Sequence, residues 1–451
     1  MDYVPHTEDD IKKMLEFIGV KSLEELYTVI PQDLILKKPI GIPPAESEPE
    51  IMVEMRKIAS SNLDISMNRD FRGGGIERHY IPPIVSALTS RGEFLTAYTP
   101  YQPEMSQGIL QAIFEYQTMI CELTGMEVSN ASSYDGGTGL GDALIMAKVH
   151  KTDSNRTLIS AGLNPQYKEV IRTYNLGLEL DIVEIPNVQG EIDEARFLDE
   201  IKKGANAVII QTPNFFGIVE NPQKVKRIAD AIHAVKGLMI ISSHPISLAI
   251  LKTPGEMGAD IAAGEGQCLG NMPSFGGPTL GYFAVSGKQL RKLPGRLIGE
   301  TTDDEGNKAY VMTLQAREQH IRREKATSNI CSNQALNALA AAIYMSYYGK
   351  EGIRRLARRM ASLTRYAIKK FSDIEGISIA HPNKPYFHEF VINVNGDPDE
   401  LLKKIYQNGF AGGLSLKNVL PEFPRGILVT LKECTGKNDI DELTQMYGDL
   451  L

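Results

Sequence analysis

The feature that most constrains the fold is a regular alternation of short apolar segments with amphipathic segments in the middle of the chain. The apolar segments predict strands at residues 157–160, 179–185, 207–211, 238–242 and 260–263. The segments between them carry apolar residues at helical spacing, which predicts helices at about 165–175, 194–203 and 222–236. Such an alternation is typical of a mostly parallel sheet that helices cover on both faces. We therefore expect an α/β fold.

Residues 1–65 are predicted to form an N-terminal helical arm. Thr7 is a good helix N-cap with acidic residues after it, and Gly19 is a good helix end. A second short helix is expected directly afterwards. A proline-rich stretch at 39–49 predicts an extended linker, and a further helix is expected from about Glu48 to Ser60. A segment this small and broken is expected to wrap over another surface.

Near residue 325 the alternation ends and a second pattern begins. An alanine-rich helix is predicted at 332–348 and a basic helix at 351–371. A smaller α+β unit follows, with strands near 377–380, 387–394 and 427–431 and helices near 398–408 and 438–448. The sequence thus predicts a large α/β domain at 66–330 and a small C-terminal domain at 331–451.

Composition and charge argue against several classes of function. The 451 residues carry a net charge of −8, which argues against non-specific binding to nucleic acid. No run of about 18 apolar residues predicts a membrane span, and the first residues lack the features of a secretory signal. The four cysteines form no CxxC pair, so we expect neither disulfides nor a metal site, and we expect a cytoplasmic protein.

Residues 132–139 form a glycine-rich turn that opens a predicted helix. Free N–H groups and the positive end of the helix dipole make such a turn suitable for an anion. A plain helix entry explains the same residues, because glycine turns are common. Both readings stay open at this point.

Residues 258–283 predict a strand at 260–263, a glycine-punctuated loop at 264–277 and a second strand at 281–286. Loops that follow strand ends form the ligand sites of α/β proteins, so this loop is a candidate wall of a site. In a pyridoxal phosphate (PLP) enzyme of the aminotransferase type, the lysine that forms the imine is expected here. The chain has Gln267 instead, and an amide cannot form an imine.

Long and compositionally unusual motifs occur along nearly the whole chain. They are HTEDDIKKML, FRGGGIERHYIPP, TAYTPYQPEMSQG, SNASSYDGGTGLGDALIMA, QTPNFFGIVEN, GADIAAGEGQCLGNMPSFGGPTLGYFA and REKATSNICSNQAL. On these motifs the chain resembles the P-proteins of the glycine cleavage system, and among them the α subunits of the two-subunit form.

The resemblance implies the PLP-dependent fold type I, with a large and a small domain. It implies an enzyme that decarboxylates glycine and passes the aminomethyl group to the lipoyl arm of the H-protein. It also implies an α2β2 assembly in which the β subunit holds PLP on its lysine. Two alternatives are a non-catalytic scaffold or regulatory subunit of the β subunit, and an independent PLP transferase or lyase that uses another lysine.

The resemblance also implies candidate site residues. Tyr98, Tyr101 and Gln102 are expected to reach a site shared with the β subunit, although they could equally pack the junction with the arm. Gly136, Gly137 and Thr138 lie where PLP-bearing family members bind phosphate, and here this cradle is expected to be vestigial. The acidic partner of the PLP ring is absent from residues 241–245, ISSHP. His79 could be an acid–base group, but a structural role is expected.

Overall fold

The computed structural model describes residues 5–38, 40–62, 64–151, 153–275, 277–326, 328–330 and 332–451. Pro39 of the expected linker, Gly276 of the expected loop and Cys331 lie outside the described residues. By their internal contacts the residues divide into two units, 1–64 and 65–451. None of the described helices is long and apolar enough to cross a lipid bilayer.

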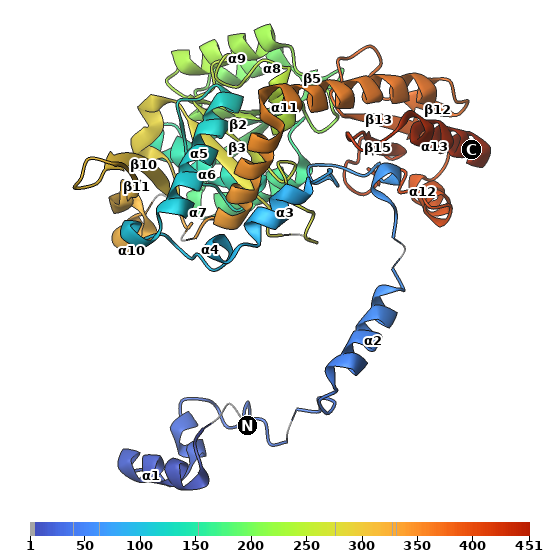
Figure 1. The fold of residues 1–451 in the computed structure, drawn as a ribbon. Helices are drawn as coiled ribbons and strands as arrows, with labels where there is room; N and C mark the ends of the chain where they lie inside the picture. Colours follow the sequence, from blue (N-terminus) through green and yellow to red (C-terminus); the bar gives the residue numbers. More distant parts are fainter. Residues whose placement is uncertain are drawn as a thin grey trace. The chain divides into compact units, whose positions relative to one another are not determined.

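The first unit consists of short helices connected by extended chain (Figure 1). Its elements are α1 (Glu8–Ile18), the 3-10 helix η1 (Leu23–Tyr27) and α2 (Glu48–Ala59). The predicted ends of α1 are confirmed, because Thr7 and Asp10 form a reciprocal capping box and Gly19 has a left-handed φ of 86°. No residue of α1 or α2 is buried in the described structure.

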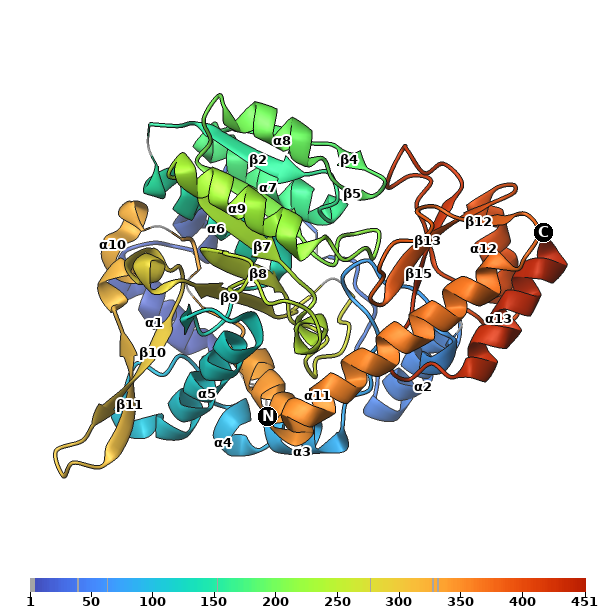
Figure 2. The ribbon, with the colours of Figure 1, turned by 90° about the horizontal axis from the view of Figure 1, so that it is seen from above.

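The second unit is built on a seven-stranded sheet in the order β1-β9-β8-β7-β6-β2-β3 (Figure 2). Its strands are β1 (Val128–Ser129), β2 (Arg156–Ser160), β3 (Asp181–Ile185), β6 (Ala207–Gln211), β7 (Leu238–Ser242), β8 (Ile261–Glu265) and β9 (Gly281–Val285). The pairs β2–β3, β2–β6, β6–β7 and β7–β8 are parallel, while β9 runs antiparallel to β8. The predicted mostly parallel sheet is confirmed.

Helices bury both faces of this sheet. They are α5 (Gln107–Thr124), α6 (Gly136–His150), α7 (Pro165–Leu178), α8 (Glu194–Ile201), α9 (Pro222–Ala234) and α11 (Ala335–Ser372). Along β6, Val208 and Ile210 join the core cluster formed with α8, α9 and α11. Ala207 and Ile209 point the other way and join the cluster formed with α6 and α7. This alternation explains why the first four positions of the strand are all apolar.

The C-terminal residues form a separate four-stranded antiparallel sheet in the order β12-β13-β15-β14. Its strands are β12 (Ile377–Ile379), β13 (Glu389–Val394), β14 (Leu414–Ser415) and β15 (Gly426–Thr430), and its helices are α12 (Pro398–Gln407) and α13 (Lys437–Leu450). The second half of α11 packs on β12 and α13. The two helices predicted at 332–348 and 351–371 are joined in α11 across a kink at Gly349, whose φ is 59°.

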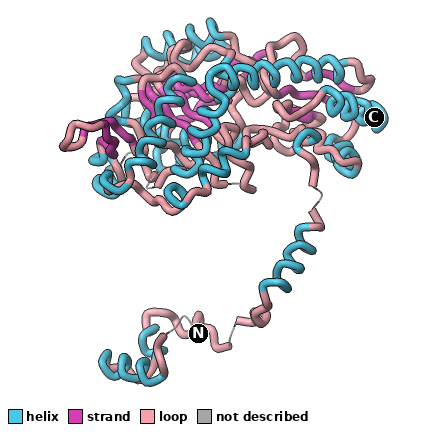
Figure 3. The backbone as a smooth tube through the Cα atoms, viewed as in Figure 1, coloured by secondary structure: helices cyan, strands magenta, loops and turns pink. Residues whose placement is uncertain are grey.

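The structure also contains elements that the sequence did not predict, and Figure 3 shows them by type. Two helices lie between residues 83 and 95, where the sequence predicted no element; they are α3 (Pro83–Thr89) and α4 (Gly92–Leu95). Further elements are the hairpins β10 (Leu297–Thr302) with β11 (Lys308–Thr313) and β4 (Asn187–Val188) with β5 (Glu191–Ile192), and the short helix α10 (Gln319–Arg322). The remaining 3-10 helices are η2 (Met67–Arg69), η3 (Pro103–Met105), η4 (Pro245–Ala249), η5 (Gly287–Lys292), η6 (Gln315–Arg317) and η7 (Arg323–Lys325).

Candidate functional site

A small cavity lies where the parallel strands β6, β7 and β8 end, the usual position of a ligand site in an α/β sheet. Its volume is about 40 Å³, room for about three water-sized spheres. The C-terminal sheet contributes His388 and Glu389 to its lining, and the segment before α3 contributes Glu77. With Glu265 from β8, three carboxylate side chains line the cavity.

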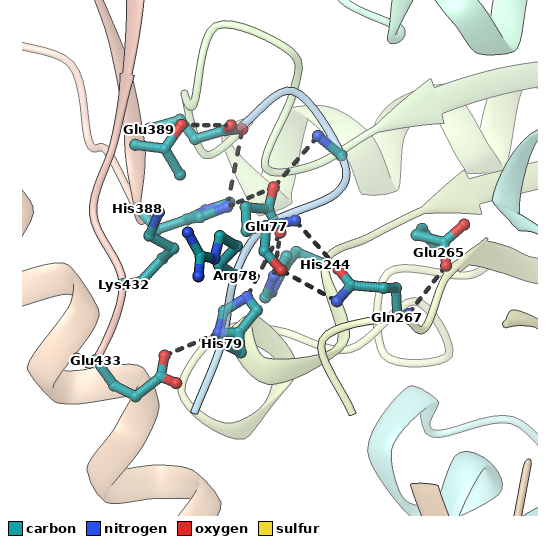
Figure 4. Close-up of polar contacts among 12 residues, drawn as sticks. Glu77, Arg78, His79, His244, Glu265, Gln267, His388, Glu389, Lys432 and Glu433 are labelled. Atoms are coloured by element: carbon teal, nitrogen blue, oxygen red, sulfur yellow. Dashed lines mark hydrogen bonds and ion pairs between the residues drawn. The ribbon is translucent and has the colours of Figure 1, made fainter. Parts of the chain in front are cut away.

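Gln267, the residue at the position expected for a PLP lysine, is completely buried. Its side-chain oxygen accepts a hydrogen bond from the Glu77 amide (3.1 Å), and its side-chain nitrogen donates to the Glu77 carbonyl (3.0 Å) and to the Asn271 carbonyl. The amide therefore pairs with the backbone of Glu77 in both directions, as a β-bridge would. Figure 4 shows these hydrogen bonds between Gln267 and Glu77, which we call the Gln267–Glu77 clasp.

Carboxylates occupy backbone donors at the N-terminus of α6. The Gly136 amide donates to Glu265 (3.0 Å), and the Thr138 amide donates to Asp135, the N-cap residue (2.7 Å). A Cβ on Gly136 would lie 2.5 Å from the Glu265 amide nitrogen, so glycine is required by this close approach. Burial raises the pKa of Glu265 to about 7, although three backbone amides that bond to its carboxyl oppose the shift.

Three histidines and several glutamates gather beside the cavity (Figure 4). His79 Nδ1 forms a hydrogen bond with a carboxylate oxygen of Glu433 at 2.8 Å. On the other side of the ring, His79 Nε2 faces Glu77 Oε2 at 3.5 Å. His244 Nε2 lies 3.9 Å from the same Glu77 oxygen. His388 Nε2 lies 3.8 Å from the other oxygen, Glu77 Oε1. The side chains of Glu77 and His79 are almost completely buried.

Burial and neighbouring charges shift the pKa values of these groups in opposite directions. Burial alone would lower the pKa of His79, but the carboxylates of Glu433 and Glu77 outweigh it and raise that pKa to about 9. Burial and the neighbouring His388 lower the pKa of His244 well below its ordinary value. Burial raises the pKa of Glu389. The cluster thus mixes charged and neutral groups at neutral pH.

The tyrosine loop lies elsewhere. Tyr98 is 79% exposed, and its hydroxyl is 3.5 Å from that of Ser332. The Tyr101 hydroxyl accepts a hydrogen bond from Arg296 at 3.4 Å. Gln102 is exposed directly before η3. None of these three residues is among those that line the described cavity, whereas Gly136 contacts Glu265, which does line it.

Sequence reasoning singled out His79 and Gln267 but missed Glu77, His244, His388 and Glu389. The last four lie on three segments that are far apart in the sequence, so no local spacing joins them. A weak signal was present, because histidine is rare in this chain, with 8 residues in 451, and two of them stand beside a strand end. His244 follows β7, and His388 precedes β13.

The sheet order, with its antiparallel strand β9, and the cavity at the strand ends define the fold of PLP-dependent enzymes of fold type I. A sphingosine-1-phosphate lyase from Burkholderia pseudomallei has this fold. It matches 92% of each chain with a TM-score of 0.65 and 14% sequence identity, which shows the fold alone.

Proteins with higher sequence identity identify the family within this fold. The chain belongs to the glycine cleavage system P-protein family, whose pattern matches residues 1–447. A probable glycine dehydrogenase (decarboxylating) subunit 1 from Anoxybacillus flavithermus is 46% identical over 447 residues, 99% of this chain and 98% of that protein. A crystal structure of glycine decarboxylase (P-protein) of the glycine cleavage system, in inhibitor-bound form, covers 100% of both chains with a TM-score of 0.88 and 39% identity. These names favour an enzyme subunit over a non-catalytic scaffold.

The residues of this cavity do not fit a PLP group. Position 267 offers an amide in place of an amine, and all three of its hydrogen bonds go to backbone atoms. The backbone amides of Gly136 and Thr138 already donate hydrogen bonds to the carboxylates of Glu265 and Asp135. A phosphate bound there would compete with these two carboxylates for the amides. The cavity is also too small for a pyridine ring with its phosphate.

Proposed function

We propose that this chain is the α subunit of a glycine decarboxylase and acts only together with a β subunit that holds PLP. The pair decarboxylates glycine and transfers the aminomethyl group to the lipoyl arm of the H-protein in the cytoplasm. The observation that carries this proposal is the full-length likeness to a glycine decarboxylase P-protein, at 39% identity and a TM-score of 0.88. The amide at position 267 supports the need for a partner.

Within this pair, we assign Tyr98, Tyr101 and Gln102 to the surface that meets the β subunit near the reacting glycine. Their exposure supports this role, because an exposed aromatic ring with a polar tip is suited to a subunit interface. Gly136, Gly137 and Thr138 are assigned to a vestigial phosphate cradle. We further propose a large domain at 66–330, a small domain at 331–451, an arm at 1–65 and an α2β2 assembly.

The test is co-expression of the chain with a P-protein β subunit, followed by a glycine–bicarbonate exchange assay. We expect exchange only when both chains are present. After borohydride reduction with PLP, mass spectrometry should find the adduct on a lysine of the β subunit. A stoichiometric lysine adduct on this chain alone, or exchange by this chain alone, would overturn the proposal.

The tyrosine loop is tested in the same complex with Tyr98→Phe and Tyr101→Phe. Each change removes one hydroxyl and keeps the ring, so the complex should still assemble while turnover falls roughly 10-fold or more. Tyr347→Phe, a change at another exposed tyrosine, is the control and should keep full activity. Two assembled variants with full activity would remove these residues from the site.

A further inference from the structure

The buried cluster beside the cavity has the geometry of a metal site. Glu77 Oε2, His79 Nε2 and a ring nitrogen of His244 lie within 4.8 Å of one another. The distances from Glu77 Oε2 to Nε2 of His79 and of His244 are 3.5 and 3.9 Å, which are too long for good hydrogen bonds. Ligand atoms about 2.0–2.1 Å from a tetrahedral zinc ion stand roughly 3.3 Å from one another, so a small contraction would close the set around an ion.

Five ring nitrogens of the three histidines in this cluster have no hydrogen-bond partner among the described residues. His79 Nε2 and both ring nitrogens of His244 and of His388 are buried without one in the described residues. The side chain of His79 is 0% exposed and that of His388 is 4% exposed. Native proteins rarely leave buried polar atoms unpaired, because each such atom costs about 1–3 kcal/mol. Three of these nitrogens, Nε2 of His79, of His244 and of His388, lie 3.5, 3.9 and 3.8 Å from Glu77. Three unpaired nitrogens around one carboxylate point to a missing ligand.

Neighbouring residues hold these side chains in the orientation that a metal needs. Glu433 binds His79 Nδ1 at 2.8 Å, which directs Nε2 toward Glu77. A carboxylate that binds the far nitrogen of a metal-ligating histidine is the commonest outer partner in such sites. On the other side, Gln267 clasps the backbone of Glu77, and the Gly75 amide donates to Glu77 Oε1 at 3.2 Å. The second carboxylate oxygen of Glu77 is thereby left facing the two imidazoles.

The charge of the surroundings favours a cation. Glu77, Glu265 and Glu389 line the cavity, and Glu433 lies behind His79. The side chain of Lys432 is also buried, but its Nζ donates a hydrogen bond to the backbone carbonyl of Asp70. Two imidazoles with one carboxylate form the ligand set that zinc and similar divalent transition metals prefer. The cavity volume leaves room for a water molecule as a further ligand.

We propose that Glu77, His79 and His244 bind one zinc-like divalent transition-metal ion, with His388 or a water molecule as the fourth ligand. The site is made of imidazoles and a carboxylate, so the expectation of no metal site, drawn from the cysteines, does not bear on it. The ion joins the end of β7 to the segment before α3, and through Glu433 it is connected to the chain that follows β15. It lies beside the cavity at the strand ends and holds the surrounding segments together.

The test uses the full chain alone. The protein is stripped with a chelator, loaded with excess Zn²⁺ and dialysed, and bound zinc is counted by inductively coupled plasma mass spectrometry. We expect one equivalent per chain, with X-ray absorption showing nitrogen and oxygen ligands at about 2.0–2.1 Å from the zinc. Wild-type protein that retains no zinc, or whose zinc has sulfur ligands, would overturn the assignment.

Variants then separate this site from surface binding. Glu77→Gln and His79→Asn should each lower the zinc affinity more than about 100-fold, and Glu433→Gln, which keeps every ligand, should lower it about 10–100-fold. The matched control is His6→Asn, because His6 is an exposed histidine of the first unit, and it should retain the wild-type equivalent. Circular dichroism of each variant checks that it is folded. Unchanged affinity in the folded Glu77 and His79 variants, or loss of zinc in His6→Asn, contradicts the site.

Discussion

At the scale of single residues, Gln267 has a structural role at the position where the sequence analysis expected a PLP lysine. Its side chain is buried and makes three hydrogen bonds, two to the backbone of Glu77 and one to Asn271. Each bond satisfies a backbone group that water does not reach. The residue therefore fixes the conformation of the segment before α3, where Glu77 and His79 stand.

Gln267→Met is expected to destabilise the chain by about 2–4 kcal/mol, because a side chain of similar size would leave backbone groups of Glu77 and Asn271 unpaired. The shift of the urea unfolding midpoint measures this effect. The control is Gln445→Met, which removes one hydrogen bond to Asp449 on an exposed helix face. It should change the free energy of unfolding by less than about 0.5 kcal/mol. Equal shifts in the two variants would show that the clasp contributes little.

Asp142 on α6 gives a pH-dependent prediction. Its carboxyl is buried, it accepts one hydrogen bond from Ser328 (3.0 Å), and burial raises its pKa from 3.8 to about 7. The folded chain therefore holds a proton that the unfolded chain loses, so stability is present below about pH 4 and falls as the pH rises through about 7. At about 1.4 kcal/mol per pKa unit, the shift from 3.8 to about 7 corresponds to a loss on the order of 4 kcal/mol.

Asp142→Asn should remove this loss. We expect the variant to gain stability relative to the wild type between pH 5 and pH 8, measured as the difference between their urea midpoints at each pH. Comparing differences cancels the titration of other buried carboxyl groups, such as Glu220 and Glu265. A difference that stays constant over this range would mean that Asp142 ionises normally in the folded chain.

At the scale of elements, the loop after β6 packs against β13 at a position where only glycine fits. Gly217 has a φ of 80°, and a Cβ on it would lie 1.8 Å from the carbonyl oxygen of Glu389. Gly204, which follows α8, has nearly the same φ, 81°, but no atom within 4 Å of its Cβ position. The two glycines thus share a left-handed backbone conformation, and only Gly217 is in close contact with a neighbouring strand.

Gly217→Ala is expected to destabilise the chain by about 3 kcal/mol or more, since the loop must move away from β13. Gly204→Ala should cost only about 1–2 kcal/mol, the strain of a left-handed residue with a side chain. Thermal unfolding of the two variants gives the comparison. Similar thermal unfolding midpoints for the two variants would mean that the loop at Gly217 can move without losing its packing on β13.

Elements whose residues are buried on both sides could be predicted well from the sequence. The strands at 207–211 and 238–242 were predicted with the observed ends, because the first four positions of each are apolar and turn residues bound them. The hairpin β10–β11 was missed, since its outer half is exposed and polar. Helices α3 and α4 were missed because prolines and glycines surround them.

The candidate site was only partly predictable. The loop after β8 and the amide at Gln267 follow from local pattern, since the strand, turn and strand are contiguous. The meeting of Glu77, His244 and His388 depends on packing between the end of β7, the segment before α3 and the C-terminal sheet. Such long-range contacts leave no periodic trace in a single sequence.

At the scale of the whole molecule, the first unit has apolar side chains without a core. Phe17 is 93% exposed and Val53 is 67% exposed, and no residue of α1 or α2 is buried in the described structure. Apolar helices of this kind are usually covered by a partner. We expect limited trypsin digestion to cut the chain alone within residues 12–57, and the β subunit to protect these sites in the complex.

Mass spectrometry of the digestion products, with and without the β subunit, measures this protection. Lys308, an exposed residue of the hairpin β10–β11, provides an internal reference site in the same digest. Equal cleavage within residues 12–57 in both samples would mean that the partner leaves the first unit uncovered.

The clasp between Gln267 and Glu77 also limits how this chain can change. A lysine at position 267 would restore an amine, but it could not accept the hydrogen bond from the Glu77 amide, and it would stand beside a cradle filled by Glu265. Any route from this chain to one that carries the cofactor itself, in evolution or in the laboratory, must therefore alter several positions together. In the pair that we propose, these hydrogen bonds would keep the cofactor on the other polypeptide.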